Sequence, residues 1–92
     1  LDRYDRDFAV AFNAAKSQAQ ALGKYTPEFI AALTAVNFQL GTSWKSKFPS
    51  TWNSLLNGNY LDAITRLRQS LWAKQTPVRV ADFTNAIINA YA

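Results

Sequence analysis

One segment of the sequence is apolar on nearly every side and is bounded by signals for the start and the end of a helix. It reads TPEFIAALTAVNFQLG and covers residues 26–41. The Thr26 hydroxyl can cap free amides, Pro27 suits the first turn, and Gly41 can end the helix. A helix that is apolar nearly all round belongs in the interior of a bundle. The segment therefore predicts a central buried helix with other helices packed around it.

The preceding residues predict one long amphipathic helix over residues 1–22. Asp2 can cap its start, and Gly23 can end it. Its apolar positions recur at helical spacing and share one side: Tyr4, Phe8, Ala11, Ala15, Ala19 and Leu22. We expect this side to face the core.

Residues 43–92 predict several short helices followed by a final longer one. TSWKSKF can form a brief helix that Pro49 interrupts. STWNSLLNG predicts a helix of two turns, capped at Ser50 and ending near Gly58.

The segment NYLDAITRLRQSLWA predicts the next helix, with Asn59 as its cap. Its apolar stripe is Leu61, Ile64, Leu67 and Leu71. The last helix begins with Thr76 as its cap, and it is expected to bury Val80, Phe83, Ile87 and Tyr91. No segment shows the strict alternation of a strand. The sequence thus predicts an all-α fold over residues 1–92, a single compact bundle of about six helices around one long central helix.

The composition removes several classes of catalytic and metal site. The chain has no cysteine and no histidine, which excludes disulfides, thiolate chemistry and the commonest metal ligand and general base. It has three glycines and no glycine-rich phosphate loop. Charged residues interrupt every long apolar run, so no membrane span is expected. We expect no bound metal and no cofactor.

A pair of carboxyl groups would be the remaining route to glycoside hydrolysis. Glu28 is the only glutamate, and the helix N-terminus at which it is predicted favours its charged form, the opposite of what a general acid needs. The aspartates fit solvated, capping or surface positions: Asp2, Asp5, Asp7, Asp62 and Asp82. The residues alone therefore predict no catalytic pair.

The net charge of +4 is unevenly distributed along the chain. Residues 1–40 carry four basic and four acidic side chains, whereas residues 41–92 carry six basic and two acidic ones. Such an excess favours solubility or an anionic partner, such as a cell-wall polymer or a nucleic acid. STWNSLLNGNYLDAITRLR could form a helix-turn-helix, but its apolar stripe is expected in the core. We keep DNA binding as a minor alternative and expect no nucleic-acid partner.

Arg79 is unusual because its charge opposes its predicted surroundings. The sequence TPVR opens the last helix and places Arg79 in the first turn, where the helix dipole is positive. A cation at this position indicates a partner elsewhere. Trp44, Trp52 and Trp72 could stack on sugar rings or bases, but tryptophans in a small helical domain are more often core residues.

Two stretches in this order resemble a known family. AVNFQLGTS, followed about thirty residues later by SLWAKQTPVRV, is similar to the carboxy-terminal lobe of the T-even phage lysozymes, the muramidases of glycoside hydrolase family twenty-four. The intervening FPSTWNSLLNGNYLDAITRLRQS matches the family's order of a short helix, a turn and a further helix. The opening helix looks like the one that joins the two lobes. The resemblance covers essentially the whole chain and implies a lysozyme-like lobe.

The resemblance also implies roles for particular residues. Arg79 matches an arginine that points into the cleft and pairs with the catalytic glutamate of the amino-terminal lobe. Phe38 and Gln39 match positions whose backbone lines the saccharide groove, and Trp72 matches a structural aromatic beside it. The sequence departs from the family at two positions near the sugar. The family has an amide and a lysine there, whereas this chain has Arg66 and Gln69, so substrate contacts are expected to differ.

The family's catalytic glutamate, aspartate and threonine lie in the amino-terminal lobe, and no counterpart precedes Leu1. We therefore expect the chain alone to be inactive and leave open whether it is a fragment or a natural truncation. Its expected partners are peptidoglycan glycan strands or the missing lobe, and exposed apolar surface could promote self-association. As a phage endolysin for bacteriolysis, it would be made in the host cytoplasm and act at the cell wall. The alternative is a non-enzymatic protein of lysozyme fold that binds cell wall or another protein.

Overall fold

The computed structural model describes the backbone of residues 2–92 and the side chains of residues 7–92. Within this range the chain is helical apart from short connections, so the expected all-α fold is confirmed. The described residues form seven helices, where about six were expected: α1 (Asp2–Leu22), α2 (Pro27–Leu40), α3 (Trp44–Lys47), α4 (Pro49–Leu56), α5 (Tyr60–Arg68), α6 (Leu71–Gln75) and α7 (Pro77–Tyr91). The roles that we expected for Asp2, Tyr4 and Asp5 fall on side chains outside the described ones.

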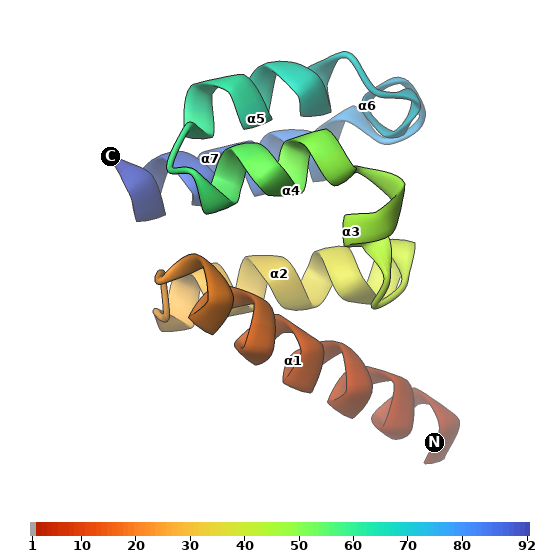
Figure 1. The fold of residues 1–92 in the computed structure, drawn as a ribbon. Helices are drawn as coiled ribbons and strands as arrows, with labels where there is room; N and C mark the ends of the chain where they lie inside the picture. Colours follow the sequence, from red (N-terminus) through yellow and green to blue (C-terminus); the bar gives the residue numbers. More distant parts are fainter. Residues whose placement is uncertain (1) are drawn as a thin grey trace.

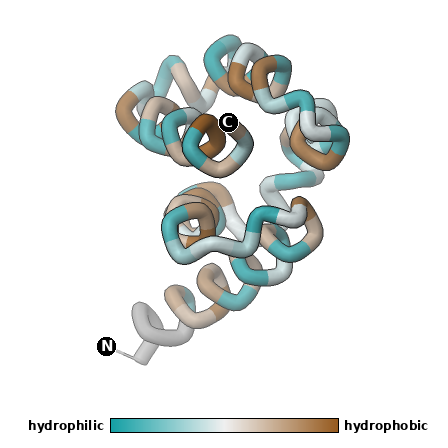
Figure 2. The backbone as a smooth tube through the Cα atoms, turned by 90° about the vertical axis from the view of Figure 1, so that its left-hand side faces the viewer, coloured by the Kyte–Doolittle hydropathy of each residue, from teal (hydrophilic) through white to brown (hydrophobic). Residues whose placement is uncertain are grey.

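The helices form two layers, with α3 leading from one to the other (Figure 1). One layer is the pair α1 and α2, and the other contains α4, α5, α6 and α7. α2 also packs against α7, so it lies at the interface of the two layers. The largest fully buried side chains come from five of the seven helices: Phe29, Leu33, Trp44, Leu55, Leu67, Phe83 and Ile87. They belong to a single hydrophobic core, and hydrophilic and hydrophobic positions are mixed along the helices where Figure 2 colours them.

The start and the end of α2 follow the predicted signals. The Thr26 hydroxyl accepts a hydrogen bond from the Phe29 backbone N–H at 3.3 Å, and Pro27 occupies the first position. Gly41 has a φ of 94°, which favours glycine, and its N–H donates to the Asn37 carbonyl at 2.9 Å. Both signals are therefore confirmed.

The caps predicted for three later helices do not form. α4 begins at Pro49, one residue before the predicted cap Ser50, because the fixed φ of proline suits the first helical position. Asn59 precedes α5 but makes no side-chain bond to it. The Thr76 hydroxyl donates backwards to the Trp72 carbonyl at 3.3 Å, so it satisfies the end of α6 instead of the start of α7.

The helix predicted over residues 59–73 is two helices, and half of its apolar stripe was wrong. α5 ends at Arg68, and Ser70 caps the start of α6: its hydroxyl accepts from the Ala73 backbone N–H at 3.3 Å and donates to the Leu67 carbonyl at 2.6 Å. This break shifts the helical phase and leaves Leu71 68% exposed. Leu61 is 64% exposed, because Ala63 takes the core position and lies two residues, or about 200°, further around the helix. Ile64 and Leu67 are buried as predicted.

On the α1 side, the contact between the two helices of the first layer is made largely by small side chains. Ala11, Ala15 and Ala19 of α1 are all buried, as their spacing predicted. Phe8 was expected on the same side but is 47% exposed, so this part of the prediction was wrong. A ring at the edge of the contact has no room between two backbones that approach over alanines.

α2 is less enclosed than its apolar sequence predicted. Phe29, Leu33 and Val36 are buried, whereas Ala31 and Ala35 are exposed on another side of the helix. This exposed side is the floor of the site described below.

A buried amide pair joins the first three helices. The Gln18 and Asn37 side chains donate to each other's carbonyl oxygens at 3.0 and 2.8 Å, which links α1 to α2. The Trp44 indole N–H of α3 donates to the Gln18 carbonyl oxygen at 3.1 Å. All three side chains are at most 4% exposed. Each polar group in this low-dielectric site is therefore costly to leave without a partner.

Tyr91 closes the core near the end of α7. Its hydroxyl donates to the Leu55 carbonyl at 3.0 Å, and its ring meets Phe29 edge-on at 6.2 Å between centroids. Burial raises the pKa of Tyr91 to about 12, because the phenolate is poorly solvated there. The folded state thus holds this proton more tightly than the unfolded state, in which the pKa is about 10.

The raised pKa predicts a pH dependence at the alkaline end. Its stabilising contribution is complete below about pH 10 and is lost as the pH rises towards 12. In a titration of phenolate absorbance, we expect the last ionisation step to disappear in a Tyr91→Phe variant. The exposed Tyr25→Phe variant is the control and should keep that step. A late step that survives in Tyr91→Phe would assign it to another tyrosine.

Within residues 2–92, no helix combines the length and the apolar character needed to cross a membrane.

Candidate functional site

Arg79 occupies the position that the sequence predicted, the third residue of α7. The first turn of α7 contains no acidic residue. The Arg79 side chain is exposed and makes no hydrogen bond or ion pair with any group in the described part of the chain. The guanidinium therefore lies at the positive end of a helix without a counter-charge from these residues.

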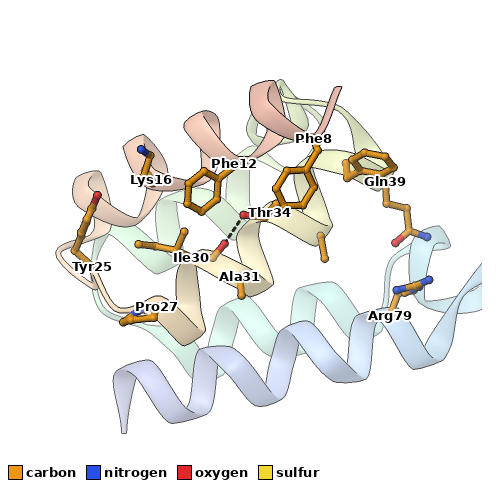
Figure 3. Close-up of a pocket in the computed structure, with 12 residues that line it drawn as sticks. Phe8, Phe12, Lys16, Tyr25, Pro27, Ile30, Ala31, Thr34, Gln39 and Arg79 are labelled. Carbon is orange, nitrogen blue, oxygen red and sulfur yellow. Dashed lines mark hydrogen bonds between the residues drawn. The ribbon is translucent and has the colours of Figure 1, made fainter. Parts of the chain in front are cut away.

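A pocket of ≈ 990 Å³ opens beside Arg79 between α1 and α2 (Figure 3). We call it the α1–α2 pocket, and its lining residues are Phe8, Phe12, Lys16, Tyr25, Pro27, Ile30, Ala31, Thr34, Ala35, Phe38, Gln39 and Arg79. Figure 3 places Gln39 and Arg79 at one end, and Lys16 and Tyr25 at the other. The space between these ends is mainly aromatic and aliphatic.

The predicted site residues Phe38 and Gln39 lie in this pocket together with Arg79. Both belong to the last turns of α2, and both side chains are exposed. The Phe38 ring also has a contact within the chain. The sequence placed these three residues in one site through the family resemblance, and the fold brings them to one rim.

Trp72 lies behind that rim, in the core. Its side chain is 6% exposed and packs against Phe48 and Phe83, with ring centroids 6.3 and 6.2 Å away. Together with Gln39 and Arg79 it lines a second pocket of ≈ 50 Å³. Its indole N–H is buried and has no hydrogen-bond acceptor among the described residues. Trp72 therefore supports the rim from inside and has no open ring face for stacking on a sugar.

Arg66 and Gln69 lie at the end of α5 and line neither of these two pockets. The Arg66 guanidinium donates to the Asp62 carboxylate at 2.8 Å. The Ser54 hydroxyl donates to the same carboxylate at 2.5 Å, and these two bonds lower the pKa of Asp62. Asp62 is thus held ionised, as a structural partner of its neighbours.

The carboxyl groups of the described side chains offer no acid and base facing each other. Asp7, Glu28 and Asp82 are exposed, and Asp62 is ionised and paired. A general acid needs an apolar pocket that keeps it protonated. Among residues 7–92, no group of three or more metal-ligating side chains could hold a metal ion.

Part of the pocket was missed in the sequence. Phe8, Phe12 and Lys16 follow one another at intervals of four residues, so they form a stripe of their own on α1, beside the buried alanines. This spacing was the available signal. Tyr25 and Thr34 had no such signal, because their place in the pocket depends on how α1 crosses α2.

No family model matches the chain, and neither a curated protein nor a solved structure shows a significant similarity to it.

Proposed function

We propose that this chain is the carboxy-terminal lobe of a phage-type peptidoglycan muramidase. In this proposal the lobe supplies one wall of the saccharide cleft, and Arg79 holds a catalytic carboxylate that another part of the protein provides. The observation that carries the proposal is the exposed guanidinium of Arg79, which has no partner among residues 7–92, on the rim formed with Gln39. A guanidinium recognises a carboxylate through two parallel charge-assisted hydrogen bonds.

The surroundings of Arg79 support this assignment in two ways. The rim residues Phe38 and Gln39 come from the end of α2, which gives an extended ligand a surface beside the guanidinium. None of the described residues that line the α1–α2 pocket is acidic, so among them an incoming carboxylate meets no like charge, although Asp82 lines the small second pocket together with Arg79. The described residues also hold no carboxyl pair suited to glycoside hydrolysis, which is why the acid must come from elsewhere.

The proposal predicts different activities for two forms of the protein. We expect no clearing of a peptidoglycan suspension by the 92-residue chain alone. A longer form that carries the proposed amino-terminal lobe should clear it, and Arg79→Gln in that form should lower the rate at least about tenfold. Lys74→Gln is the control, because Lys74 is exposed and lines neither pocket near Arg79. Clearing by the 92-residue chain, or an Arg79→Gln variant with full activity, would contradict the proposal.

The second candidate is a non-enzymatic protein that binds cell wall or another protein through the same surface. The large apolar pocket beside Arg79 favours it, because exposed apolar surface of this kind marks interaction sites. The same experiment separates the two candidates. A longer form that does not clear peptidoglycan, while the chain cosediments with purified cell wall at low salt, would favour the binding protein.

A further inference from the structure

The walls of the α1–α2 pocket form a continuous apolar surface. The Phe8 and Phe12 rings are 47% and 40% exposed and stack at 6.2 Å between centroids, with 12° between their planes. Opposite them, the small side chains of Ala31 and Ala35 line the floor of the pocket and leave room above it. The Thr34 hydroxyl is directed to the Ile30 carbonyl at 2.7 Å, so its proton is not available to a ligand. The middle of the pocket thus offers shape and apolar contact but few polar partners.

The described charges of the pocket lie at its ends and have one sign. Lys16 and Arg79 are the charged side chains that line it among residues 7–92, and no carboxylate of that range lines it. The Lys16 ammonium lies 4.9 Å from the Phe12 ring centroid, so part of its electrostatic attraction is already used within the chain. Arg79 has no such contact among the described residues. The unsatisfied charge is therefore concentrated at the Arg79 end.

We propose that the α1–α2 pocket binds a long-chain fatty carboxylate. Its carboxylate pairs with the Arg79 guanidinium, and its hydrocarbon chain lies along Phe8 and Phe12 over the alanine floor. One anionic end and one unbranched apolar chain match a pocket with an apolar middle and, at one end, a cation that no described carboxylate pairs with. The volume of ≈ 990 Å³ is at the upper end of the range of small-molecule sites. The proposal requires only this pocket and Arg79 and can hold without the muramidase assignment; in a muramidase the fatty carboxylate and the catalytic carboxylate would compete for the same guanidinium.

Other occupants fit the pocket less well. A glycan lying along its middle would need hydrogen-bond partners along its length, which the floor of Ile30, Ala31 and Ala35 does not provide. A second copy of this chain would bring a net charge of +4 towards Lys16 and Arg79, which electrostatic repulsion disfavours. An acidic amphipathic peptide shares the charge complementarity, and the experiment below separates it from a fatty carboxylate.

The test is a titration of the isotope-labelled 92-residue chain with sodium decanoate and sodium dodecanoate, below the concentrations that form micelles. We expect saturable changes of amide chemical shifts at Phe8, Phe12, Ala31 and Arg79. Dodecanoate should bind about fourfold more tightly than decanoate, since the open pocket buries roughly half of each added methylene. Dodecyltrimethylammonium, which has the same chain and the opposite charge, should bind at least about tenfold more weakly than dodecanoate.

Three variants separate the contributions of the ligand's carboxylate group and of its hydrocarbon chain to binding. Arg79→Gln should weaken dodecanoate binding about fivefold, a modest factor because the site is exposed to solvent and salt. Ala31→Trp adds an indole to the floor and should weaken both carboxylates and the cationic analogue. Lys74→Gln, outside the pocket, should change nothing. Amide spectra of the three variants verify that each is folded.

Several results would overturn the proposal. The cationic analogue could bind as tightly as dodecanoate, or Ala31→Trp could leave the affinity unchanged, and either result would place the ligand elsewhere. Shift changes confined to residues outside the pocket would have the same meaning. An acidic amphipathic peptide that binds where dodecanoate does not would show that the pocket is a protein-docking surface.

Discussion

A Gln18→Leu substitution is expected to lower the free energy of unfolding by about 3 kcal/mol, because it leaves two buried polar groups without partners. The Trp44 indole N–H and the Asn37 carbonyl oxygen both bond to the Gln18 amide. Leucine has a similar volume, so little of the loss arises from packing. Urea unfolding of the two proteins measures the difference. The matched control is Gln20→Leu on the same helix, where the side chain is exposed and the effect should stay within about 0.5 kcal/mol.

A substitution of Asn37, the hydrogen-bond partner of Gln18, tests the same amide pair from the other side. Asn37→Leu should also destabilise the fold, because it leaves the Gln18 amide N–H without its acceptor. Combining it with Gln18→Leu removes both members of the pair, so the double variant should lose less than the sum of the single losses. Strictly additive losses, or equal effects of Gln18→Leu and Gln20→Leu, would show that the amide pair contributes nothing specific.

A Trp44→Ala substitution should have the largest effect in the chain, about 4 kcal/mol. The indole is fully buried, and it meets Trp52 and Phe83 edge-on with centroids 5.7 and 5.8 Å away. Its removal leaves a cavity where the two layers join and deprives Gln18 of a donor. For a domain of this size, a loss of about 4 kcal/mol should lower Tm by at least about 15 °C in calorimetry.

Trp52→Ala is the matched control for this substitution. Trp52 is only partly buried and meets the Trp44 ring edge-on. The Lys45 ammonium lies 4.8 Å from the centroid of the Trp52 ring. We expect Trp52→Ala to lower the free energy of unfolding by less than half as much as Trp44→Ala does. If both variants lost the same stability, the core would not be centred on Trp44.

The parts of the fold that could be predicted are those that local chemistry determines. The Thr26 cap and the Gly41 stop act within one turn of chain, and the structure confirms both. The buried alanines of α1 follow from helical spacing. The cap at Thr76 was wrong because the same hydroxyl can bond to the preceding helix or to the following one. Propensity does not distinguish these two states, and the structure has the bond to α6.

In the candidate site too, the locally determined features could be predicted and those that depend on tertiary packing could not. The position of Arg79 in the first turn of α7 could be read from Thr-Pro, and no side chain of residues 7–92 pairs with it; the partner expected elsewhere stays a prediction. The α1–α2 pocket could not be predicted, because it depends on how α1, with its small buried side chains, crosses α2. Phe8 is exposed for this reason, although its spacing places it near the buried side. Tertiary geometry thus decides which apolar residues form the core and which form the pocket.

The amide pair also fixes the axial alignment of α1 on α2. The alanine side of α1 is smooth and by itself offers little resistance to a slide of α1 along α2 by one turn. Such a slide would bring Ala14 or Leu22 to the place of Gln18 and bury an amide among methyl groups. The amide pair therefore fixes the position of α1 along α2. Because Phe8 and Phe12 belong to α1, these hydrogen bonds also set the distance of both rings from Arg79.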